Sequence, residues 1–468
     1  MKHMALSAVI VKAYPLITAP LFLYFFTKDE FGALDFAYYV MSLSCILLTL
    51  GVHNGYARYA LDLSIESNLS VKKYSYLLVS TFLVIVFALS ITLIISIFDL
   101  RVKDWLPMNL QTHQHIFALY IVSGALAYSA LTAERFSLNA TMLIAITLLI
   151  YILPLFTLVI LFIITEKIEL HIVLLYQSIF NSFAFILSFL RSICKADIER
   201  IFSSCKRYII YSFPLIFALV GEALINLVGR LFLTQLYPQG LGDFAIAGRI
   251  ASVALIMNFF IAFMFHPFYY RDHNNKEFKE FWKALYSFFV TFYCFAISIS
   301  PLLMTLIWEY LNKPLEKTTI YSVALFLSAN LLAGLQIFHL GMHVREKTFL
   351  VALIYLITAP ITVALNFILI TKYFVLGASL ALVATMTLIS IPYIYFSNVD
   401  SKQQLTTNIY AKICLALTIV FFSLISIGYE QQDLTLLLPI TLIATGLLIA
   451  TMRNATIQYY EYHSKAQI

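Results

Sequence analysis

The chain has 468 residues, of which 62% are hydrophobic and 12% are charged. A soluble protein would carry roughly a quarter charged residues, so this composition excludes a soluble enzyme and a soluble binding domain. The mean hydropathy of +0.89 and the repeated apolar runs of about 20 residues indicate an all-α polytopic membrane protein.

Fourteen apolar segments are long enough to form membrane-spanning helices. In chain order they are Ala5–Phe26, Ala33–Val52, Ser75–Phe98, His115–Thr132, Ala140–Thr165, Leu170–Leu190, Tyr208–Leu236, Phe244–Phe268, Ala284–Trp308, Ile320–Met342, Thr348–Thr371, Val375–Ser397, Ile409–Gly428 and Leu434–Met452. The connections between them are short, so we expect no soluble catalytic module. Lys12 interrupts the first apolar segment and no small-residue cleavage site follows, which predicts a retained span and not a signal peptide.

Lysine and arginine are distributed unequally between the two sides of these spans. Twenty of the 30 lie on the side that holds both termini and seven lie on the other side, while Lys12, Arg230 and Arg249 lie within spans. Because cytoplasmic loops carry the excess of positive charge, we predict that both termini are cytoplasmic. This distribution explains the formal net charge of +6 without a nucleic-acid partner.

A weak internal repeat divides the first twelve spans into two sets of six. The longest basic connection, Arg191–Arg207, lies between spans six and seven. Each half opens on Pro-Leu-Ile, preceded by Tyr14 or Phe213, and then turns at a glycine, Gly32 or Gly242. Six-span repeats are typical of transporters. We therefore predict an N-terminal lobe over residues 1–195, a C-terminal lobe over residues 196–400 and an appended pair of spans over residues 401–468.

Span seven carries three polar residues spaced four apart, Glu222, Asn226 and Arg230, with Gly221 and Gly229 beside them. Residues at this spacing drift only about 40° per step around a helix, so they form one polar stripe. An ionisable residue at the centre of a span costs about 2.5–3.5 kcal/mol and normally faces a protein interior or a wet cavity. Two interpretations stay open, a cavity-lining face and a ladder of ion pairs that fixes helix packing. Gly221 and Gly229 would allow a neighbouring backbone or a ligand to approach closely.

Four further charged residues lie near span ends, and each has a simpler alternative role. Lys12 and Arg249 could line a lumen or reach out to the lipid headgroups. Arg58 could serve a lumen or act as a positive anchor at the cytoplasmic end of span two. Asp35 could take part in ion coupling or cap the start of its helix, where the helix dipole favours a carboxylate.

Several uncharged polar residues lie inside spans. Gln336, His339 and His343 share one face of span ten, where lumen lining or structural hydrogen bonding is favoured over a metal site, because no Cys, Asp or Glu completes one. Gln177 and Asn181 in span six are typical of hydrogen bonds between helices. The five cysteines lack paired spacing and no GxxxxGK[ST] loop occurs. We therefore expect no metal, no cofactor and no ATP hydrolysis, so transport would be facilitated, ion-coupled or potential-driven.

Three pairs of motifs follow one another along the chain. They are PLITAPLFLYFFTKDEFGALDFAYYV with LGVHNGYARYALD, YIIYSFPLIFALVGEALINLVGRLFL with LGDFAIAGRIASVAL, and GMHVREKTFLVALIYLITAPITVALNFILI with VLGASLALVAT. In their order and spacing they resemble the polysaccharide exporters of the multidrug/oligosaccharidyl-lipid/polysaccharide flippase superfamily, to which the O-antigen (Wzx-type) flippases belong. The resemblance covers spans one to twelve.

This resemblance implies two six-helix lobes that form a V around a central cationic cavity. It implies a multi-pass transporter of the cell inner (plasma) membrane, and not an enzyme, that flips an undecaprenyl-pyrophosphate-linked oligosaccharide to the outer leaflet. Such a substrate would serve lipopolysaccharide O-antigen or another surface polysaccharide, and its expected partners are membrane lipids and glycan polymerase or assembly proteins. Because guanidinium groups match phosphate oxygens with forked donors, basic residues would bind the pyrophosphate.

The resemblance also implies roles for individual residues. Lys12, Arg58 and Arg249 occupy places where the related lipid II flippases carry lumenal basic residues, and Asp35 lies where those carry an acid. The expected substrate-binding residues are Arg230, Arg249, Lys12, Arg58 and Asn226, the expected coupling-ion residues are Glu222 and Asp35, and the expected polar lining of the lumen is Gln336 and His339.

Two other classes of protein stay open. A drug or cation antiporter of the same fold would need an acidic cavity, whereas the charges in and near these spans favour an anion. A membrane-embedded glycan polymerase or acyltransferase would present a large outer loop with catalytic residues. The longest outer connection, Asp99–Gln114, is short and has no paired carboxylates.

Overall fold

The computed structural model is built of helices, with no β-strand among the residues that it describes. These residues are 10, 14, 17–18, 21–22, 24–59, 69–97, 106–137, 139–193, 198–258, 260–261, 275–310, 317–338, 348–401 and 448–459. Ten of its helices are long and apolar enough to cross a membrane. The predicted class, an all-α polytopic membrane protein, is therefore confirmed.

These ten helices correspond to predicted spans two to twelve, because the longest of them holds two spans. That helix, Phe349–Ser397, is interrupted at Phe374, whose φ of 51° and ψ of −123° are not helical. The break falls between the predicted spans Thr348–Thr371 and Val375–Ser397. Most of span one, all of span thirteen and most of span fourteen lie outside the described residues, so the total of fourteen stays a prediction.

Close contacts divide the chain into two compact units, which we describe separately. The first comprises residues 1–245 and 348–367, and the second comprises residues 246–347 and 368–468. The predicted boundary between an N-terminal and a C-terminal lobe, at residue 195, is a different kind of division, because it separates the two halves of a transporter. That boundary stays a prediction.

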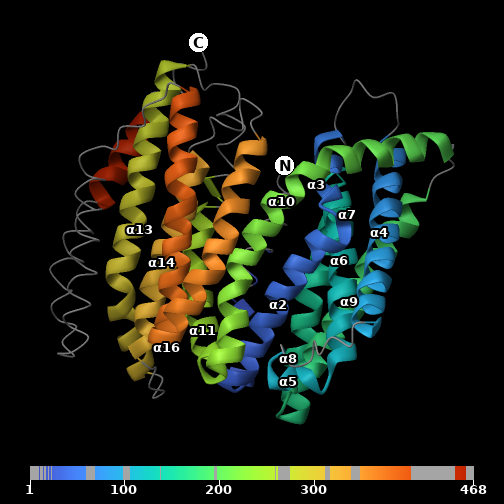
Figure 1. Cartoon of the computed structure of the whole chain (residues 1–468), viewed down its shortest axis with the longest axis horizontal. Helices are drawn as coiled ribbons and strands as arrows, with labels where there is room; N and C mark the ends of the chain where they lie inside the picture. Colours follow the sequence, from blue (N-terminus) through green and yellow to red (C-terminus); the bar gives the residue numbers. More distant parts are fainter. Residues whose placement is uncertain are drawn as a thin grey trace. The chain divides into compact units, whose positions relative to one another are not determined.

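The first unit contains the helices of predicted spans two to seven and residues 348–367 of predicted span eleven (Figure 1). They are α2 (Lys28–Thr49), α3 (Val52–Tyr59), α4 (Leu69–Ile97), α5 (Met108–Gln111), α6 (Gln114–Phe136), α7 (Ala140–Thr147), η2 (Leu148–Ile152), α8 (Leu153–Thr165), α9 (Leu170–Ser192) and α10 (Ile198–Leu236), followed by η3 (Pro238–Gly240) and the start of α11 (Leu241–Ala251). Helix α6 packs against α2, α4 and α9, and α10 packs along α2, α3 and α4. Ala125, Ala130 and Ala133 of α6 are fully buried, and such small side chains let neighbouring helices approach closely.

A π-helical turn interrupts one span of the first unit, and a side chain from the next span satisfies it. Helices α7, η2 and α8 follow one another without a gap, and Pro154 lies just after the π-helical turn. Proline has no backbone N–H, so the carbonyl of Ile150, four residues earlier, loses its usual donor. Gln177 Nε2 of α9 donates to that oxygen over 2.8 Å. The predicted helix-to-helix hydrogen bond of Gln177 is therefore confirmed.

Replacing Gln177 with leucine is expected to destabilise the protein by about 1–3 kcal/mol, because the buried Ile150 carbonyl would lose this donor. The measurement is thermal unfolding of the purified protein in detergent. Gln114→Leu is the matched control, because Gln114 is exposed at the start of α6. An equal melting temperature for Gln177→Leu and the control would contradict this role.

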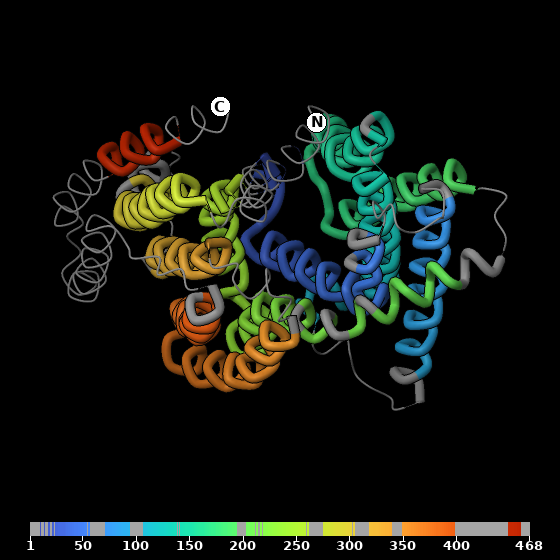
Figure 2. Tube along the Cα trace, turned by 90° about the horizontal axis from the view of Figure 1, so that it is seen from above, coloured from blue at the N-terminus to red at the C-terminus, as the bar shows by residue number. Residues whose placement is uncertain are grey.

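The second unit contains the helices that follow. They are the rest of α11, then η4 (Ser252–Ala254), α13 (Lys276–Tyr310), α14 (Lys317–Phe338) and the part of α16 (Thr348–Ser401) from residue 368 onward. Helices α13 and α14 lie side by side (Figure 2). The indole nitrogen of the buried Trp282 in α13 donates to the Phe338 carbonyl at the end of α14, 3.2 Å away. This bond satisfies one of the carbonyls that a helix end leaves without a partner.

The 3₁₀ turn η4 breaks predicted span eight, and polar side chains bind carbonyls beside the break. Asn330 Nδ2 donates to the Ala251 carbonyl over 3.1 Å, and the Tyr293 hydroxyl lies 2.9 Å from the Ala254 carbonyl. Backbone at membrane depth needs such partners because hydrocarbon supplies none. These side chains therefore stabilise an irregular segment inside an apolar span.

Candidate functional site

A buried ion pair joins spans two and seven in the first unit. Arg230 Nε of α10 lies 2.7 Å from Asp35 Oδ2 of α2, and the two side chains are 3% and 2% exposed. The Arg230 guanidinium also donates through Nη1 to the backbone carbonyl of Asn226, 2.6 Å away. The sequence predicted both charged residues as site residues, and the structure brings them together across 195 residues of chain.

Two aromatic rings enclose the Arg230 guanidinium. Its Cζ lies 3.5 Å from the centroid of the Tyr39 ring and 5.1 Å from that of the Phe244 ring. Asp35 and Tyr39 are four residues apart, so they lie on the same face of α2. The ring faces attract the cation electrostatically. A carboxylate, a carbonyl and two rings therefore hold one guanidinium in place.

Helix α2 has a cap of its own, which leaves Asp35 for another role. The Thr27 hydroxyl accepts from the Glu30 backbone N–H over 3.4 Å, and Glu30 Oε2 accepts from the Thr27 backbone N–H over 3.0 Å, which makes a capping box. Asp35 lies further into the helix and is buried. The alternative that Asp35 caps this helix is therefore wrong.

The two turning glycines of the predicted repeat pack directly on each other at the predicted outer end. A Cβ atom on Gly32 would lie 2.7 Å from the Gly242 nitrogen, and a Cβ atom on Gly242 would clash with the backbone of Lys28. Lys28 Nζ also lies 3.1 Å from Asp243 Oδ1. Because the Lys28 side chain is 44% exposed, this ion pair contributes little, at most about 1 kcal/mol. Close backbone packing therefore dominates this contact.

A second close contact lies at the predicted cytoplasmic end of the same spans. The Gly55 N–H of α3 donates to Ser212 Oγ of α10 over 2.9 Å, and a Cβ atom on Gly55 would lie 2.5 Å from the Tyr208 carbonyl oxygen. The Tyr208 hydroxyl donates to the Lys72 carbonyl over 3.2 Å. Contacts at both ends thus flank the Asp35–Arg230 pair.

Alanine at Gly32 and alanine at Gly55 are expected to loosen opposite ends of this arrangement. Each added methyl group would meet backbone atoms at a distance that forces a shift. Reporter cysteines at Thr234 near the outer end and at Ser204 near the cytoplasmic end would be labelled with an impermeant maleimide in whole cells and in inverted vesicles. We expect Gly32→Ala to speed labelling at residue 234 alone, and Gly55→Ala to speed labelling at residue 204 alone.

Gly124→Ala is the matched control for both substitutions. A Cβ atom on Gly124 would meet only the flexible side chain of Met41, which can move aside. Labelling in this variant should equal that of the parent protein. Equal labelling in all three alanine variants would show that the glycine contacts do not close either end.

Asn226 and Glu222 complete the predicted stripe, but their side chains are less buried than that of Arg230. Asn226 Nδ2 donates to the Glu222 backbone carbonyl over 3.0 Å, and the Glu222 side chain is exposed. The drift of 40° per step accumulates to about 80° between residues 222 and 230, which turns Glu222 away from the buried face. Gly221 lies against Tyr355, whose Cβ would be 2.9 Å from a Cβ atom at Gly221, so the predicted close approach is confirmed at Gly221.

The other predicted site residues lie apart from this ion pair in the chain or outside the described residues. Arg249 is half-buried in the last turn of α11, and Gln336 Nε2 of α14 lies 3.3 Å from Ser390 Oγ of α16. Arg58 belongs to α3, but its side chain is not among those described. Lys12 and His339 lie outside the described residues. The roles of all five stay predictions.

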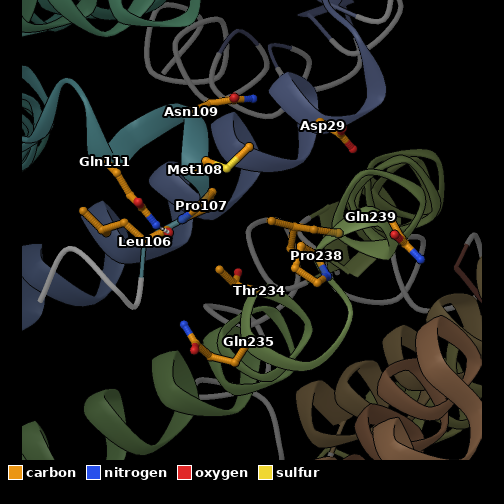
Figure 3. A pocket seen from close by; sticks show the side chains of 11 residues that line it. Asp29, Leu106, Pro107, Met108, Asn109, Gln111, Thr234, Gln235, Pro238 and Gln239 are labelled. Atoms are coloured by element: carbon orange, nitrogen blue, oxygen red, sulfur yellow. Dashed lines mark hydrogen bonds between the residues drawn. The ribbon is translucent and has the colours of Figure 1, made fainter.

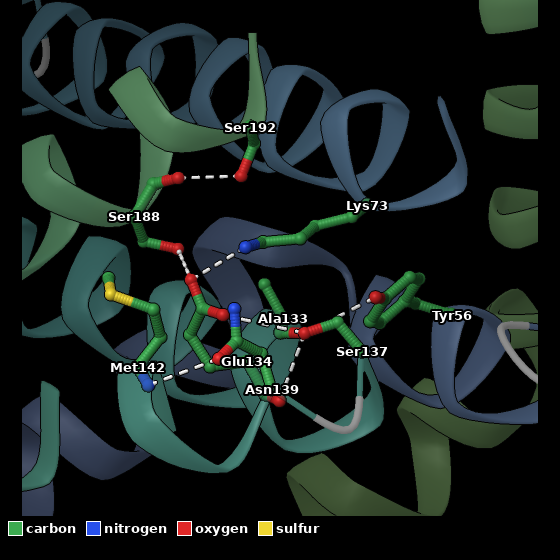
Figure 4. Close-up of polar contacts among 9 residues, drawn as sticks. All are labelled: Tyr56, Lys73, Ala133, Glu134, Ser137, Asn139, Met142, Ser188 and Ser192. Atoms are coloured by element: carbon green, nitrogen blue, oxygen red, sulfur yellow. Dashed lines mark hydrogen bonds and ion pairs between the residues drawn. The ribbon is translucent and has the colours of Figure 1, made fainter. Parts of the chain in front are cut away.

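A second buried ion pair in the first unit was not predicted (Figure 4). Lys73 Nζ of α4 lies 2.6 Å from Glu134 Oε1 of α6, with the side chains 9% and 0% exposed. Ser188 Oγ of α9 donates to the same carboxylate oxygen over 2.7 Å, and Ser137 Oγ lies 3.4 Å from the other oxygen. This cluster ties three helices together, and α4 and α6 both extend beyond the predicted spans to reach it.

Comparisons with known proteins identify the fold. No family model and no curated protein sequence matches the chain. Among solved structures, the chain is similar to one described as "Lipid II flippase MurJ, inward closed conformation", at 13% sequence identity and a TM-score of 0.54. The match covers 97% of this chain and 99% of that one. The two chains share a fold.

Proposed function

We propose that this chain is a flippase, and not an enzyme, that moves a lipid-linked oligosaccharide across the inner membrane. The observation that carries the proposal is the fold likeness, over 97% of the chain, to a protein described as a lipid II flippase. The motifs that resemble polysaccharide exporters narrow the substrate to an undecaprenyl-pyrophosphate-linked oligosaccharide, such as an O-antigen repeat unit. Glycan polymerase or assembly proteins would receive the flipped product.

Arg230 is the cation that we assign to the pyrophosphate. A doubly charged anion that leaves water needs fixed cations, and a guanidinium offers forked donors that fit phosphate oxygens. Asp35 accepts a hydrogen bond from Arg230 Nε, while Tyr39 and Phe244 keep the guanidinium plane in place. The site is therefore preorganised for an anion, and the Asp35 carboxylate is the anion that pairs with Arg230 in this structure. Arg249, Lys12 and Arg58 are the further cations of the proposal.

Exchange between Asp35 and the pyrophosphate would couple transport to an ion. Removing one partner of a buried ion pair costs about 3–5 kcal/mol, because an uncompensated charge stays behind. Asp35 can release Arg230 at low cost only when a proton or another cation neutralises its carboxylate, and the pyrophosphate then takes its place. Glu222, which is exposed on the same helix as Arg230, is the second candidate for a coupling carboxylate.

The two glycine contacts supply the gates that alternating access requires. Gly32 and Gly242 would separate for release on the outer side, and Gly55 and Tyr208 would separate for entry from the cytoplasmic side. Transporters of this kind depend on a binding site within the spans, with one gate on each side of it.

Deletion of the gene in a cell whose surface glycan depends on it tests the proposed function. We expect loss of the surface glycan and accumulation of the lipid-linked oligosaccharide in the inner leaflet, with recovery on complementation by the parent gene. Glu222→Gln is expected to restore less glycan than the parent at matched expression, whereas Glu30→Gln at the exposed cap of α2 should restore it fully. A normal glycan after deletion, together with resistance to cationic drugs on expression, would favour the antiporter.

A further inference from the structure

A pocket of about 390 Å³ lies at the predicted outer end of the first unit, apart from the ion pair (Figure 3). Its walls come from the start of α2, from the segment Leu106–Gln111, and from the end of α10 with η3. Four of its side chains are carboxamides, those of Asn109, Gln111, Gln235 and Gln239. Its volume falls within the range of roughly 300–1,000 Å³ that is typical of ligand pockets.

The chemistry of this pocket differs from that of the Arg230 site. Its lining holds neither lysine nor arginine, and Asp29 is its one ionisable residue, so it does not suit a pyrophosphate. A carboxamide both donates and accepts hydrogen bonds, as a sugar hydroxyl does. Pro107 and Met108 add apolar surface, on which the C–H face of a sugar ring can pack.

Two of the carboxamides are available to a ligand. Gln111 Nε2 donates to the Leu106 carbonyl over 2.9 Å, so this residue shapes the loop. Among the residues that the structure describes, none hydrogen-bonds the side-chain amide of Asn109 or of Gln239. Figure 3 shows these two side chains on different walls, one from the α5 segment and one from η3. A ligand between them could therefore bond to both.

We propose that this pocket binds the glycan of the substrate on the outer side of the membrane. The inference rests on the proposed function, which makes the cargo an oligosaccharide. It assigns the uncharged sugars and the pyrophosphate to two separate sites. Gln239 lies three residues before Gly242, and Asp29 three residues before Gly32, so the pocket adjoins the glycine contact that would open for release. A bound glycan would thus contact both sides of the outer gate.

Binding measurements with two separate probes test this inference on the purified full-length protein in nanodiscs. One probe is the oligosaccharide released by mild acid from the lipid-linked pool of the host cell, followed by saturation-transfer NMR and calorimetry. The other is undecaprenyl pyrophosphate without sugar. We expect the Asn109→Ala/Gln239→Ala variant to bind the oligosaccharide about tenfold more weakly, because two hydrogen bonds are lost, and to bind undecaprenyl pyrophosphate normally. Gln114→Ala, exposed on the predicted outer side and absent from the pocket lining, should leave both affinities unchanged.

The two probes separate failure of this inference from failure of the proposed function. If the parent protein binds undecaprenyl pyrophosphate but not the oligosaccharide, or if the double variant binds the oligosaccharide as the parent does, the glycan pocket is wrong and the flippase proposal stands. If the parent protein binds neither probe, both are wrong. Binding of the oligosaccharide alone, weakened in the double variant, would support the pocket and contradict the lipid pyrophosphate as cargo.

Discussion

Replacing Arg230 with methionine is expected to abolish transport and to destabilise the protein by about 3–5 kcal/mol, because the Asp35 carboxylate would stay buried without its partner. Asp35→Leu should destabilise it to a similar extent, since Arg230 would then be the unpaired charge. Both effects would be measured on the same preparations, by thermal unfolding in detergent and by recovery of surface glycan at matched expression.

The double variant Asp35→Leu/Arg230→Met separates the two interpretations that the sequence left open. Replacing a buried ion pair by apolar side chains of similar volume is often neutral for stability, so we expect the melting temperature to return toward that of the parent. Transport should stay abolished, because the cation for the pyrophosphate is missing. Recovery of both stability and transport would mean that the pair only fixes helix packing.

The Lys73–Glu134 pair is expected to give the same changes in stability but a different result for transport. Glu134→Leu alone should destabilise the protein by about 3–5 kcal/mol, because it leaves Lys73 buried without its partner. The double variant Lys73→Met/Glu134→Leu should regain most of that stability, and also transport, since this pair ties helices together and lies apart from the proposed substrate path. Failure of the stable double variant to transport would assign Lys73 or Glu134 a part in the transport cycle.

The spans and the charges within them could be predicted from the sequence because membrane burial has a clear compositional signature. Runs of apolar residues fix the number and order of spans two to twelve, and a charge inside such a run is costly enough to mark a special site. Arg230 was identified in this way, whereas Asp35, near the start of its span, was singled out by the family resemblance. Their pairing could not be predicted, because no rule of spacing connects residues so far apart in the chain.

The surroundings of the ion pair were less accessible to sequence reasoning. Tyr39 lies four residues after Asp35, so the helical period was a usable signal that the two side chains share a face. Phe244 is one of 40 phenylalanines in the chain, and nothing in its local sequence distinguishes it. Glu134 and Lys73 were missed for another reason. Both lie just outside the predicted spans, where a charge is ordinary, and only the longer helices of the structure bury them.

The importance of the turning glycines could be predicted from the sequence, but their contact with each other could not. Gly32 and Gly242 stood out as equivalent points of the two halves of the repeat, and glycine permits close approach of helices. That the two glycines would contact each other follows only from the arrangement of helices in space. The pocket beside them could not be predicted, because its amides come from two segments that lie far apart in the chain.

Reconstituted transport by the purified protein tests the central claim most directly. Proteoliposomes would carry undecaprenyl-pyrophosphate-linked oligosaccharide, and its appearance on the outer face would be followed by its access to an added glycosidase. We predict that the parent protein moves the substrate from the inner to the outer leaflet of the proteoliposomes, and that Lys73→Met/Glu134→Leu does the same. The equally stable Asp35→Leu/Arg230→Met should not. Equal transport by the two double variants, or none by the parent protein, would contradict the account.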